Sequence, residues 1–251
     1  LLNPDILNFS YDKETTTLTV TADDFLLIEN AALGYKIKYL LQSFTFESRI
    51  QRVSFAGYSV FEPMQGPPAL EDRWQNKRVE AYNGSLMHFL RSCQRNRVEE
   101  DGFKVQKVIR IPMRPPDSVI FAKLKFFNNQ SPEAKNHFDS LQYWQNKMRM
   151  PKYGQGIKHD LIKSIEYLKL TNEKGVYALS YSGILSIKYQ KSAKKSIVTF
   201  QHPFALFDDN GILLDPQSST MEGYWGTLRV ADMLPIDYEN PNLFQTQEPI
   251  N

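Results

Sequence analysis

A chain of 251 residues with 41% hydrophobic side chains can bury a substantial core, which excludes a wholly disordered protein. Thirty Lys and Arg against 28 Asp and Glu leave a net charge of +2, too small to attract a polyanion over the whole surface, so we expect no nucleic-acid partner. The single cysteine, Cys93, excludes an internal disulfide framework, and no apolar run is long enough to predict a membrane-spanning segment.

The first quarter of the chain has the residue pattern of β-strands. In ILNFSYDKETTTLTVTA, two β-rich runs flank the polar turn DKET, which predicts a hairpin. In GYKIKYLLQSFTFE, the apolar residues Tyr35, Ile37 and Tyr39 alternate with lysines, as in a half-buried strand. RVSFAGYSVFEPM predicts the neighbouring strand, with Gly57 at a bulge.

One principal helix is predicted from about residue 70 to residue 98. Its apolar residues recur at helical spacing, at Trp74, Tyr82, Leu86, Phe89 and Cys93. Acidic residues lie in its first turn and arginines near its end, which complements the helix dipole. We expect this helix to pack across one face of the sheet.

The region from 99 to 170 combines several patterns. DGFKVQKVIRI alternates as a strand does, PMRPPDS predicts a loop, and VIFAKLKF predicts another strand. PEAKNHFDSLQYWQNKM fits either a helix or a long surface excursion. HDLIKSIEYLKL fits either a helix or a strand.

From 171 to 215 the sequence predicts β hairpins. GVYALSYSGILSIKYQ contains two alternating runs around the turn Ser182-Gly183, and FALFDDNGILLD contains the hairpin signal Asn210-Gly211. The tail from 216 to 251 is acidic. It contains a short predicted helix from Thr227 to Met233, which ends before a proline.

Charge is unevenly distributed along the chain. Basic residues predominate between Lys147 and Lys195, whereas acidic residues predominate from Asp208 to Asn251. Two interpretations are open: the acidic tail packs over the basic middle, or the basic residues form a patch that binds an anionic glycan or lipid headgroup.

The stretch KRVEAYNGSLMHFLRS raises the question of a catalytic helix face. Ser85 and His88 lie three residues apart, so a hydrolase that uses them as nucleophile and base is one hypothesis. Against it, the chain contains no G-x-S-x-G elbow, and no carboxylate lies at a helical spacing that would orient His88. We therefore expect no catalytic residues, and we interpret His88 and Arg91 as members of a structural hydrogen-bond network.

Four side chains are candidates for binding a partner. Tyr224 and Trp225 lie between glycines in MEGYWG, a setting that allows surface display, and Arg78 and Arg91 are the basic candidates on the predicted helix. The four histidines are isolated, without an H-x-x-x-H or H-E-x-x-H pattern, so we expect no metal site and no cofactor.

Several stretches resemble one family of proteins: NPDILNFSYDKETTTLTVTADDFLLIENAALGYKIKYLLQSFTFE, FAGYSVFEP, RWQNKRVEAYNGSLMHFLRS with EEDGFKV, and EGYWGTLRVADMLPIDY. They resemble the region that follows an N-terminal carboxypeptidase-like regulatory domain in uncharacterised Bacteroidota cell-envelope proteins. The resemblance implies an exported protein of the periplasm or outer membrane, with a signal peptide and a small β-sandwich upstream of Leu1. It implies no catalytic residue, and the chain has no zinc-binding H-x-x-E pattern.

Together these observations predict a single α+β domain over residues 1–251, β-rich in 1–64. We expect an antiparallel, meander-like sheet with one principal helix packed on a face. The favoured function is non-catalytic binding or assembly at the cell envelope, with a glycan or an outer-membrane protein as partner. The alternatives are a hydrolase that uses Ser85 and His88, and a structural spacer.

Overall fold

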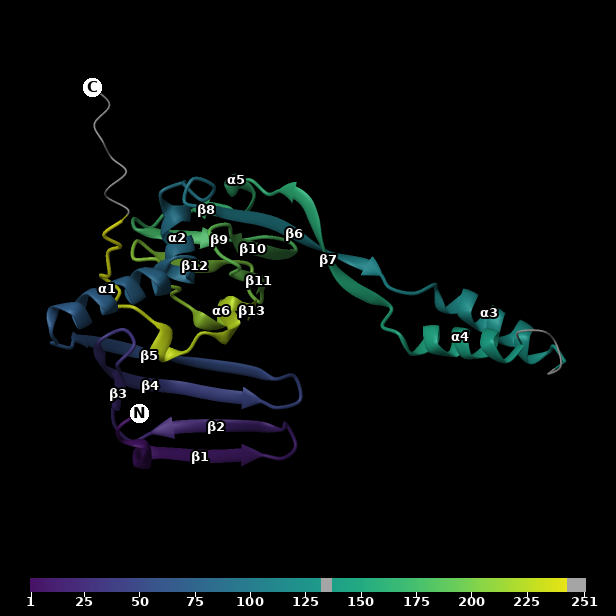
Figure 1. The fold of residues 1–251 in the computed structure, drawn as a ribbon, viewed down its shortest axis with the longest axis horizontal. Coiled ribbons are helices and arrows are strands. Elements are labelled where there is room, and N and C mark those ends of the chain that lie inside the picture. Colours follow the sequence, from purple (N-terminus) through teal and green to yellow (C-terminus); the bar gives the residue numbers. More distant parts are fainter. Residues whose placement is uncertain (132–136, 243–251) are drawn as a thin grey trace, which may run out of the picture. The chain divides into compact units, whose positions relative to one another are not determined.

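The computed structural model describes residues 1–131 and 137–242, and it contains helices and antiparallel sheets (Figure 1). This arrangement confirms the α+β fold class. The chain divides into two compact units: unit 1 comprises Leu1–Val105 with Ile162–Asn251, and unit 2 comprises Gln106–Leu161. The sequence suggested one domain, because the strand pattern continues across both boundaries and nothing local marks unit 2 as an insertion.

Sheet A of unit 1 contains β1 (Leu7–Asp12), β2 (Thr17–Ala22), β3 (Leu26–Asn30), β4 (Tyr35–Glu47) and β5 (Arg52–Pro63), preceded by the 3-10 helix η1 (Pro4–Ile6). All its pairings are antiparallel, and the predicted β1–β2 hairpin is confirmed. In β4 the predicted alternation is confirmed, because Tyr35, Ile37 and Tyr39 are buried and the lysines between them are exposed.

The bulge of sheet A lies in β4, not at Gly57 in β5 as the sequence suggested. The register shifts between Leu41 and Ser43, and Gly57 lies opposite Leu41. A Cβ atom on Gly57 would come within 2.3 Å of the Leu40 carbonyl oxygen. The glycine therefore allows close approach of the two strands, while the extra residue belongs to its partner.

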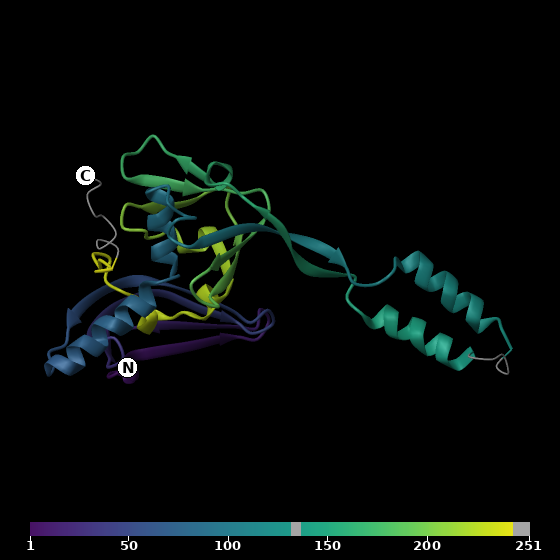
Figure 2. The same ribbon diagram turned by 45° about the horizontal axis from the view of Figure 1, so that its top comes forward.

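The helix predicted over about 70–98 is interrupted. The structure has two helices, α1 (Pro68–Tyr82) and α2 (Leu86–Gln94), separated by a turn at Gly84 with a φ of +76° (Figure 2). Helix α1 lies over sheet A, where the Trp74 indole donates a hydrogen bond of 2.8 Å to the Ala31 carbonyl. Helix α2 packs into a different core, so the apolar stripe serves two cores.

Sheet B has the order β13-β11-β10-β6-β7, and sheet C has the order β12-β9-β8. Their strands are β6 (Phe103–Pro112), β7 (Tyr153–Leu161), β8 (Leu168–Leu170), β9 (Val176–Leu179), β10 (Ile184–Tyr189), β11 (Lys195–Phe200), β12 (Ala205–Asp208) and β13 (Ser219–Gly223). The hairpin predicted around Ser182-Gly183 is wrong, because β9 pairs with β12 and β8 whereas β10 pairs with β11. The turn at Asn210-Gly211 is confirmed by a φ of +74° at the glycine and an antiparallel bridge between Phe207 and Leu213.

Two further stretches, HDLIKSIEYLKL and the tail, contain short elements. HDLIKSIEYLKL comprises the end of β7, the single turn α5 (Ser164–Tyr167) and strand β8. In the tail, η2 (Pro216–Ser218), α6 (Tyr224–Thr227) and η3 (Val230–Asp232) replace the helix predicted from Thr227 to Met233. The end of the predicted acidic tail, residues 243–251, lies outside the described residues.

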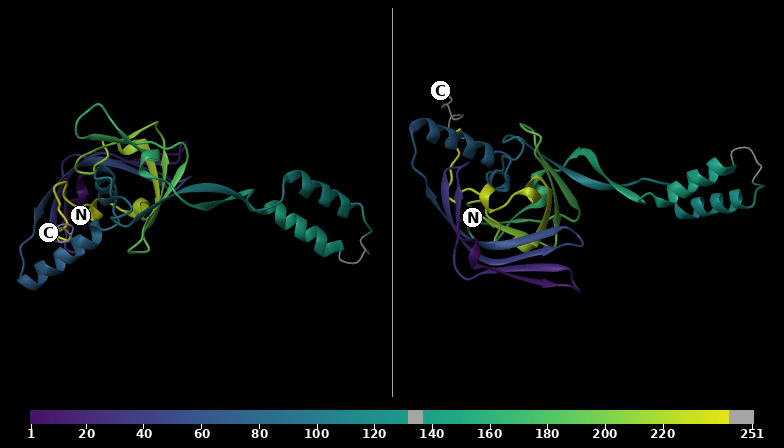
Figure 3. Two further views of the ribbon diagram at one scale, coloured as in Figure 1. Left: turned by 90° about the horizontal axis from the view of Figure 1, so that it is seen from above. Right: turned by 60° about the horizontal axis from the view of Figure 1, so that its bottom comes forward.

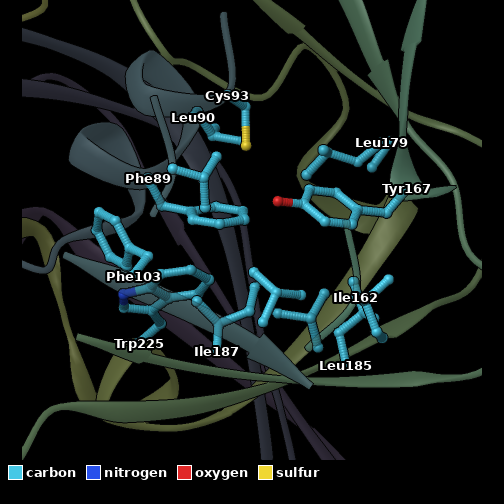
Figure 4. Close-up of a cluster of buried hydrophobic side chains, with 14 of the residues drawn as sticks. Phe89, Leu90, Cys93, Phe103, Ile162, Tyr167, Leu179, Leu185, Ile187 and Trp225 are labelled. Atoms are coloured by element: carbon cyan, nitrogen blue, oxygen red, sulfur yellow. The ribbon is translucent and has the colours of Figure 1, made fainter. Parts of the chain in front are cut away.

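The main core of unit 1 lies between α2 and the strands of sheets B and C. Phe89, Leu90 and Cys93 project from α2 toward Tyr167, whose hydroxyl points back toward them (Figure 4). A second cluster joins Tyr82 at the end of α1 to sheet A. Among the described residues, both clusters consist of unit 1 side chains, so unit 1 holds its own core.

Unit 2 is a two-stranded ribbon, β6 with β7, that continues into two antiparallel helices, α3 (Asp117–Asn128) and α4 (His137–Arg149) (Figure 3). The strand predicted for VIFAKLKF is therefore wrong. Helix α3 covers one row of side chains at helical spacing, Ile120, Leu124 and Phe127. Packing of this row against α4 outweighs the strand preference of the β-branched residues at the start of the helix. Residues 132–136, the start of PEAKNHFDSLQYWQNKM, lie outside the described residues, and α4 shows that the rest of this stretch takes the helical alternative.

Candidate functional site

The structure places Ser85 and His88 side by side without forming a catalytic pair. Ser85 is the N-cap of α2, and its Oγ accepts a hydrogen bond of 3.1 Å from the backbone N–H of His88. The His88 ring turns inward, where Nδ1 accepts a hydrogen bond of 3.1 Å from the Gly84 N–H. Nε2 has no hydrogen-bond partner among the described residues. The imidazole therefore does not contact the hydroxyl that it would have to deprotonate.

The environment of His88 is aromatic and closed. Its ring stacks on Tyr82 at 4.7 Å between centroids and meets the ring of Phe103 edge-on at 4.9 Å. Burial lowers the pKa of His88 to about 4, and the nearby Asp101 carboxylate opposes this shift. With only 2% of its surface exposed, the imidazole stays neutral and out of reach of a substrate.

Arg78 is used within the fold. Its Nε donates to the Leu33 carbonyl at 2.7 Å, and its Nη2 donates to the Gly34 carbonyl at 2.9 Å. The guanidinium also lies 4.0 Å from the centre of the Tyr35 ring. These contacts hold α1 onto the β3–β4 turn, so the cation is not free to bind a partner.

Arg91 has a similar structural role in α2. Its Nε, Nη1 and Nη2 atoms donate to the carbonyls of Asn210, Tyr238 and Ile236 at 2.8, 2.5 and 2.7 Å. A guanidinium presents several donors in a fixed plane, which suits three carbonyls from two segments. Arg91 thus joins α2 to the β12 turn and to the tail. His88 and Arg91 therefore share no hydrogen-bond partner, but both contact the Tyr82 ring, which stacks on His88 and lies 5.8 Å from the Arg91 guanidinium.

MEGYWG would allow surface display of Tyr224 and Trp225, but the structure buries the tryptophan. Trp225 is only 6% exposed, and its indole N–H donates a hydrogen bond of 2.9 Å to the Gly84 carbonyl. Tyr224 is half-buried, with the Lys194 ammonium 4.6 Å from its ring centre. The flanking glycines permit a turn that points the tryptophan into the core as readily as one that displays it on the surface. The linear sequence does not distinguish these two turns.

Unit 1 also contains a polar cleft that the sequence did not predict. It encloses about 330 Å³, and its lining residues come from the ends of α1 and α2, the β12 turn and the tail: Tyr82, Arg91, Gln94, Arg95, Asp209, Asn210, Ile236, Asp237, Glu239 and Asn240. Asp209 is already held, because it accepts hydrogen bonds from Gln94 and from the Tyr177 hydroxyl. The mixed charges could hold a small polar molecule but do not select one.

In residues 1–131 and 137–242, no group of three or more His, Cys, Asp or Glu side chains is arranged to hold a metal ion. Cys93 is fully buried, and burial raises the pKa of its thiol, which keeps it protonated and unreactive.

The apolar residues of unit 2 form its most distinctive surface. Among the described residues of α3 and α4, only Ile120 is buried, at 1% exposure. The exposed set, here called the arm surface, comprises Val119, Phe121, Phe126, Phe138, Tyr143 and Met148. Exposure reaches 75% at Phe138 and 55% at Phe126. Sequence reasoning missed this surface because it assigned VIFAKLKF to a strand, which would have buried one of its faces.

Cations accompany these aromatic side chains. The Lys147 ammonium lies 5.3 Å from the centre of the Tyr143 ring, and the Arg110 guanidinium lies 5.9 Å from that of Tyr153. At the base of α3, Asp117 forms ion pairs with Arg114 at 2.7 Å and Lys152 at 2.5 Å. Unit 2 therefore combines exposed aromatic rings with an excess of positive charge.

No family model, curated protein or solved structure matches this chain. Within the described parts of the chain, none of the helices is both long enough and apolar enough to cross a membrane.

Proposed function

We propose that this chain is a non-catalytic binding or assembly module and that the arm surface of unit 2 is its contact surface. The resemblance described above leads us to propose that it works in the cell envelope, exported to the periplasm or outer membrane. A glycan or an outer-membrane component is the proposed partner.

The arm surface carries this proposal. A pair of short helices is normally stabilised by burying an apolar face, yet α3 and α4 bury one side chain and leave six large apolar ones in water. Six exposed large apolar side chains on one short helix pair exceed the isolated exposed apolar residues that are normal on a protein surface, and such an excess is typical of interaction sites. A structural spacer would not need them, which makes that alternative the weaker one.

The structural roles of the other candidate residues support the same proposal. Ser85 caps a helix, His88 is buried, Arg78 and Arg91 bind backbone carbonyls, and Trp225 fills the core. The hydrolase hypothesis therefore receives no support from the geometry.

Capture of envelope components by the intact chain tests the proposal. The wild-type protein is immobilised and exposed to solubilised envelope proteins and glycans, beside the triple variant Phe121→Ser, Phe126→Ser, Phe138→Ser. The control is Tyr58→Ser with Val60→Ser, which removes two equally exposed side chains from β5 in unit 1. We expect the wild type and the control to retain the same component and the triple variant to lose it.

Equal retention by all three proteins would contradict the role of the arm surface. A second result would contradict the non-catalytic assignment: hydrolysis of an ester, peptide or glycoside by the wild type that Ser85→Ala abolishes while the protein remains folded.

A further inference from the structure

We infer that the arm surface docks onto an anionic lipid surface. This inference rests on the proposed function, because it names the chemistry that unit 2 contacts. It follows from the charge of unit 2, the type of its cations, the position of its aromatic rings and the length of its helices.

Charge separates unit 2 from the rest of the chain. Between Gln106 and Leu161 there are ten Lys and Arg but four Asp and Glu, a net charge of +6, whereas the remaining residues carry 20 basic and 24 acidic side chains, a net charge of −4. An anionic surface would thus attract unit 2 and repel the remainder. A second copy of unit 2 would be repelled, which argues against covering the arm surface by self-association.

The cations of unit 2 are mainly lysines. Its ten basic residues are seven Lys and three Arg. Lysine is depleted at the centres of protein–protein interfaces, where arginine is preferred. Lysines beside aromatic and aliphatic side chains are instead typical of helices that lie in the headgroup region of a bilayer, where the ammonium stays hydrated.

Each helix has a lysine close to one of its exposed rings. In α3, Lys125 directly precedes Phe126 and Lys123 lies one helical turn before it, and neither lysine forms an ion pair with a described residue. In α4, Lys147 lies beside the exposed ring of Tyr143. Phe126 and Tyr143 therefore each have a lysine beside them that can reach a phosphate while the ring enters the acyl boundary.

The dimensions of the helices favour lying in the interface. Helices α3 and α4 have 12 and 13 residues, so each is about 18–20 Å long. That is well short of the roughly 30 Å hydrocarbon core. A pair of rods about 10 Å thick can embed its exposed side chains to the depth of about 5–10 Å that is usual for interfacial helices.

Vesicle co-sedimentation of the intact chain tests the inference. The vesicles are phosphatidylcholine alone, or phosphatidylcholine mixed with an equal amount of phosphatidylglycerol. We expect at least about tenfold stronger partitioning onto the mixed vesicles at low salt, falling as salt rises. Lys123→Glu with Lys125→Glu should reduce this partitioning about tenfold or more, and Phe126→Ser with Phe138→Ser should also reduce it.

The matched control is Lys174→Glu with Lys188→Glu, which makes the same charge change at exposed positions of unit 1. It should partition as the wild type does, and circular dichroism should show all variants folded. Equal binding to both kinds of vesicle, binding to neither, or equal loss in the control would overturn the inference. So would binding to single-stranded DNA as tight as to the mixed vesicles, which would indicate a general polyanion site.

The two proposals can fail separately. Suppose that the wild type does not bind the mixed vesicles, but the unit 2 variants no longer capture a protein or glycan that the wild type retains. The lipid inference is then overturned and the proposed function stands. If neither vesicle binding nor capture depends on the arm surface, both are overturned.

Discussion

His88 links the stability of this fold to pH at the scale of a single residue. Its ring is enclosed by Tyr82, Phe103 and Tyr189, and one ring nitrogen has no hydrogen-bond partner among the described residues. Protonation would place a charge in this aromatic cavity, and burial accordingly lowers the pKa to about 4. The unfolded chain holds the same histidine near its ordinary pKa of about 6.5.

We predict that the free energy of unfolding falls as the pH is lowered from about 6.5 to about 4. In that window the unfolded state binds a proton that the folded state does not, which favours unfolding by up to about 3 kcal/mol. Urea denaturation of the wild type and of His88→Gln across this range measures the effect. The difference between the two proteins isolates His88 from the carboxylates, and parallel pH profiles would show that this assignment is wrong.

Ser85 contributes to the start of α2. Its hydroxyl accepts a hydrogen bond from the His88 N–H, one of the donors that a helix N-terminus leaves unsatisfied. We predict that Ser85→Ala costs about 1 kcal/mol of unfolding free energy, measured by chemical denaturation, because this cap is lost. Ser85→Thr keeps a capping hydroxyl and should recover most of the loss. An unchanged stability in Ser85→Ala would rule out the capping role.

Gly84 divides one predicted helix into two elements. Its φ of +76° is strained for residues with a side chain, and a Cβ atom there would lie 2.9 Å from the ring of Tyr189. The Gly84 carbonyl also accepts the hydrogen bond from the Trp225 indole. The turn therefore places α1 on sheet A and α2 in the main core, and it secures the segment that contains α6.

We predict that Gly84→Ala lowers the free energy of unfolding by more than about 2 kcal/mol. About 1–2 kcal/mol comes from the left-handed backbone, and the contact with Tyr189 adds to this. Gly66→Ala is the control for the backbone contribution, because Gly66 precedes α1 without a positive φ, while its added Cβ would also lie near side chains, 3.2 Å from Leu70 and Trp74. Thermal denaturation of both variants provides the measurement. An increase in stability for Gly84→Ala would mean that a continuous helix is compatible with the fold.

Elements were predictable where the neighbours of a residue decide its structure. The alternation through Tyr35, Ile37 and Tyr39 identified β4. The pair Asn210-Gly211 identified the turn after β12. VIFAKLKF was assigned wrongly because its β-branched residues favour a strand, while packing against α4 selects the helix. The strands that pair with β9 and β10 could not be predicted either, because strand pairing depends on segments distant in the sequence.

At the scale of the whole molecule, unit 2 is an insertion in unit 1. The chain leaves unit 1 in β6 and returns in β7, and Pro112 pairs with Tyr153 where the ribbon meets the helices. The two core clusters contain no described residue of unit 2. Unit 1 should therefore fold without α3 and α4.

We predict that replacing residues 113–152 with Asn-Gly leaves unit 1 folded. The new turn closes the ribbon at the paired positions Pro112 and Tyr153 with the two-residue loop that such hairpins favour. The unfolding midpoint followed by circular dichroism should shift by less than about 4 °C, equal to about 1 kcal/mol for a chain of this size. Loss of cooperative unfolding would show that unit 1 depends on the insertion.

The sequence by itself determined the α+β class, the N-terminal hairpin, the helical periodicity on either side of Gly84 and the uneven distribution of charge along the chain. These properties depend on spacing and composition, which act over a few residues. Only the tertiary structure decided that the helix breaks, that β9 and β10 separate, that Trp225 is buried, and that Phe121, Phe126, Phe138 and Tyr143 remain exposed. Those outcomes depend on contacts between segments distant along the chain, and local periodicity carries no information about them.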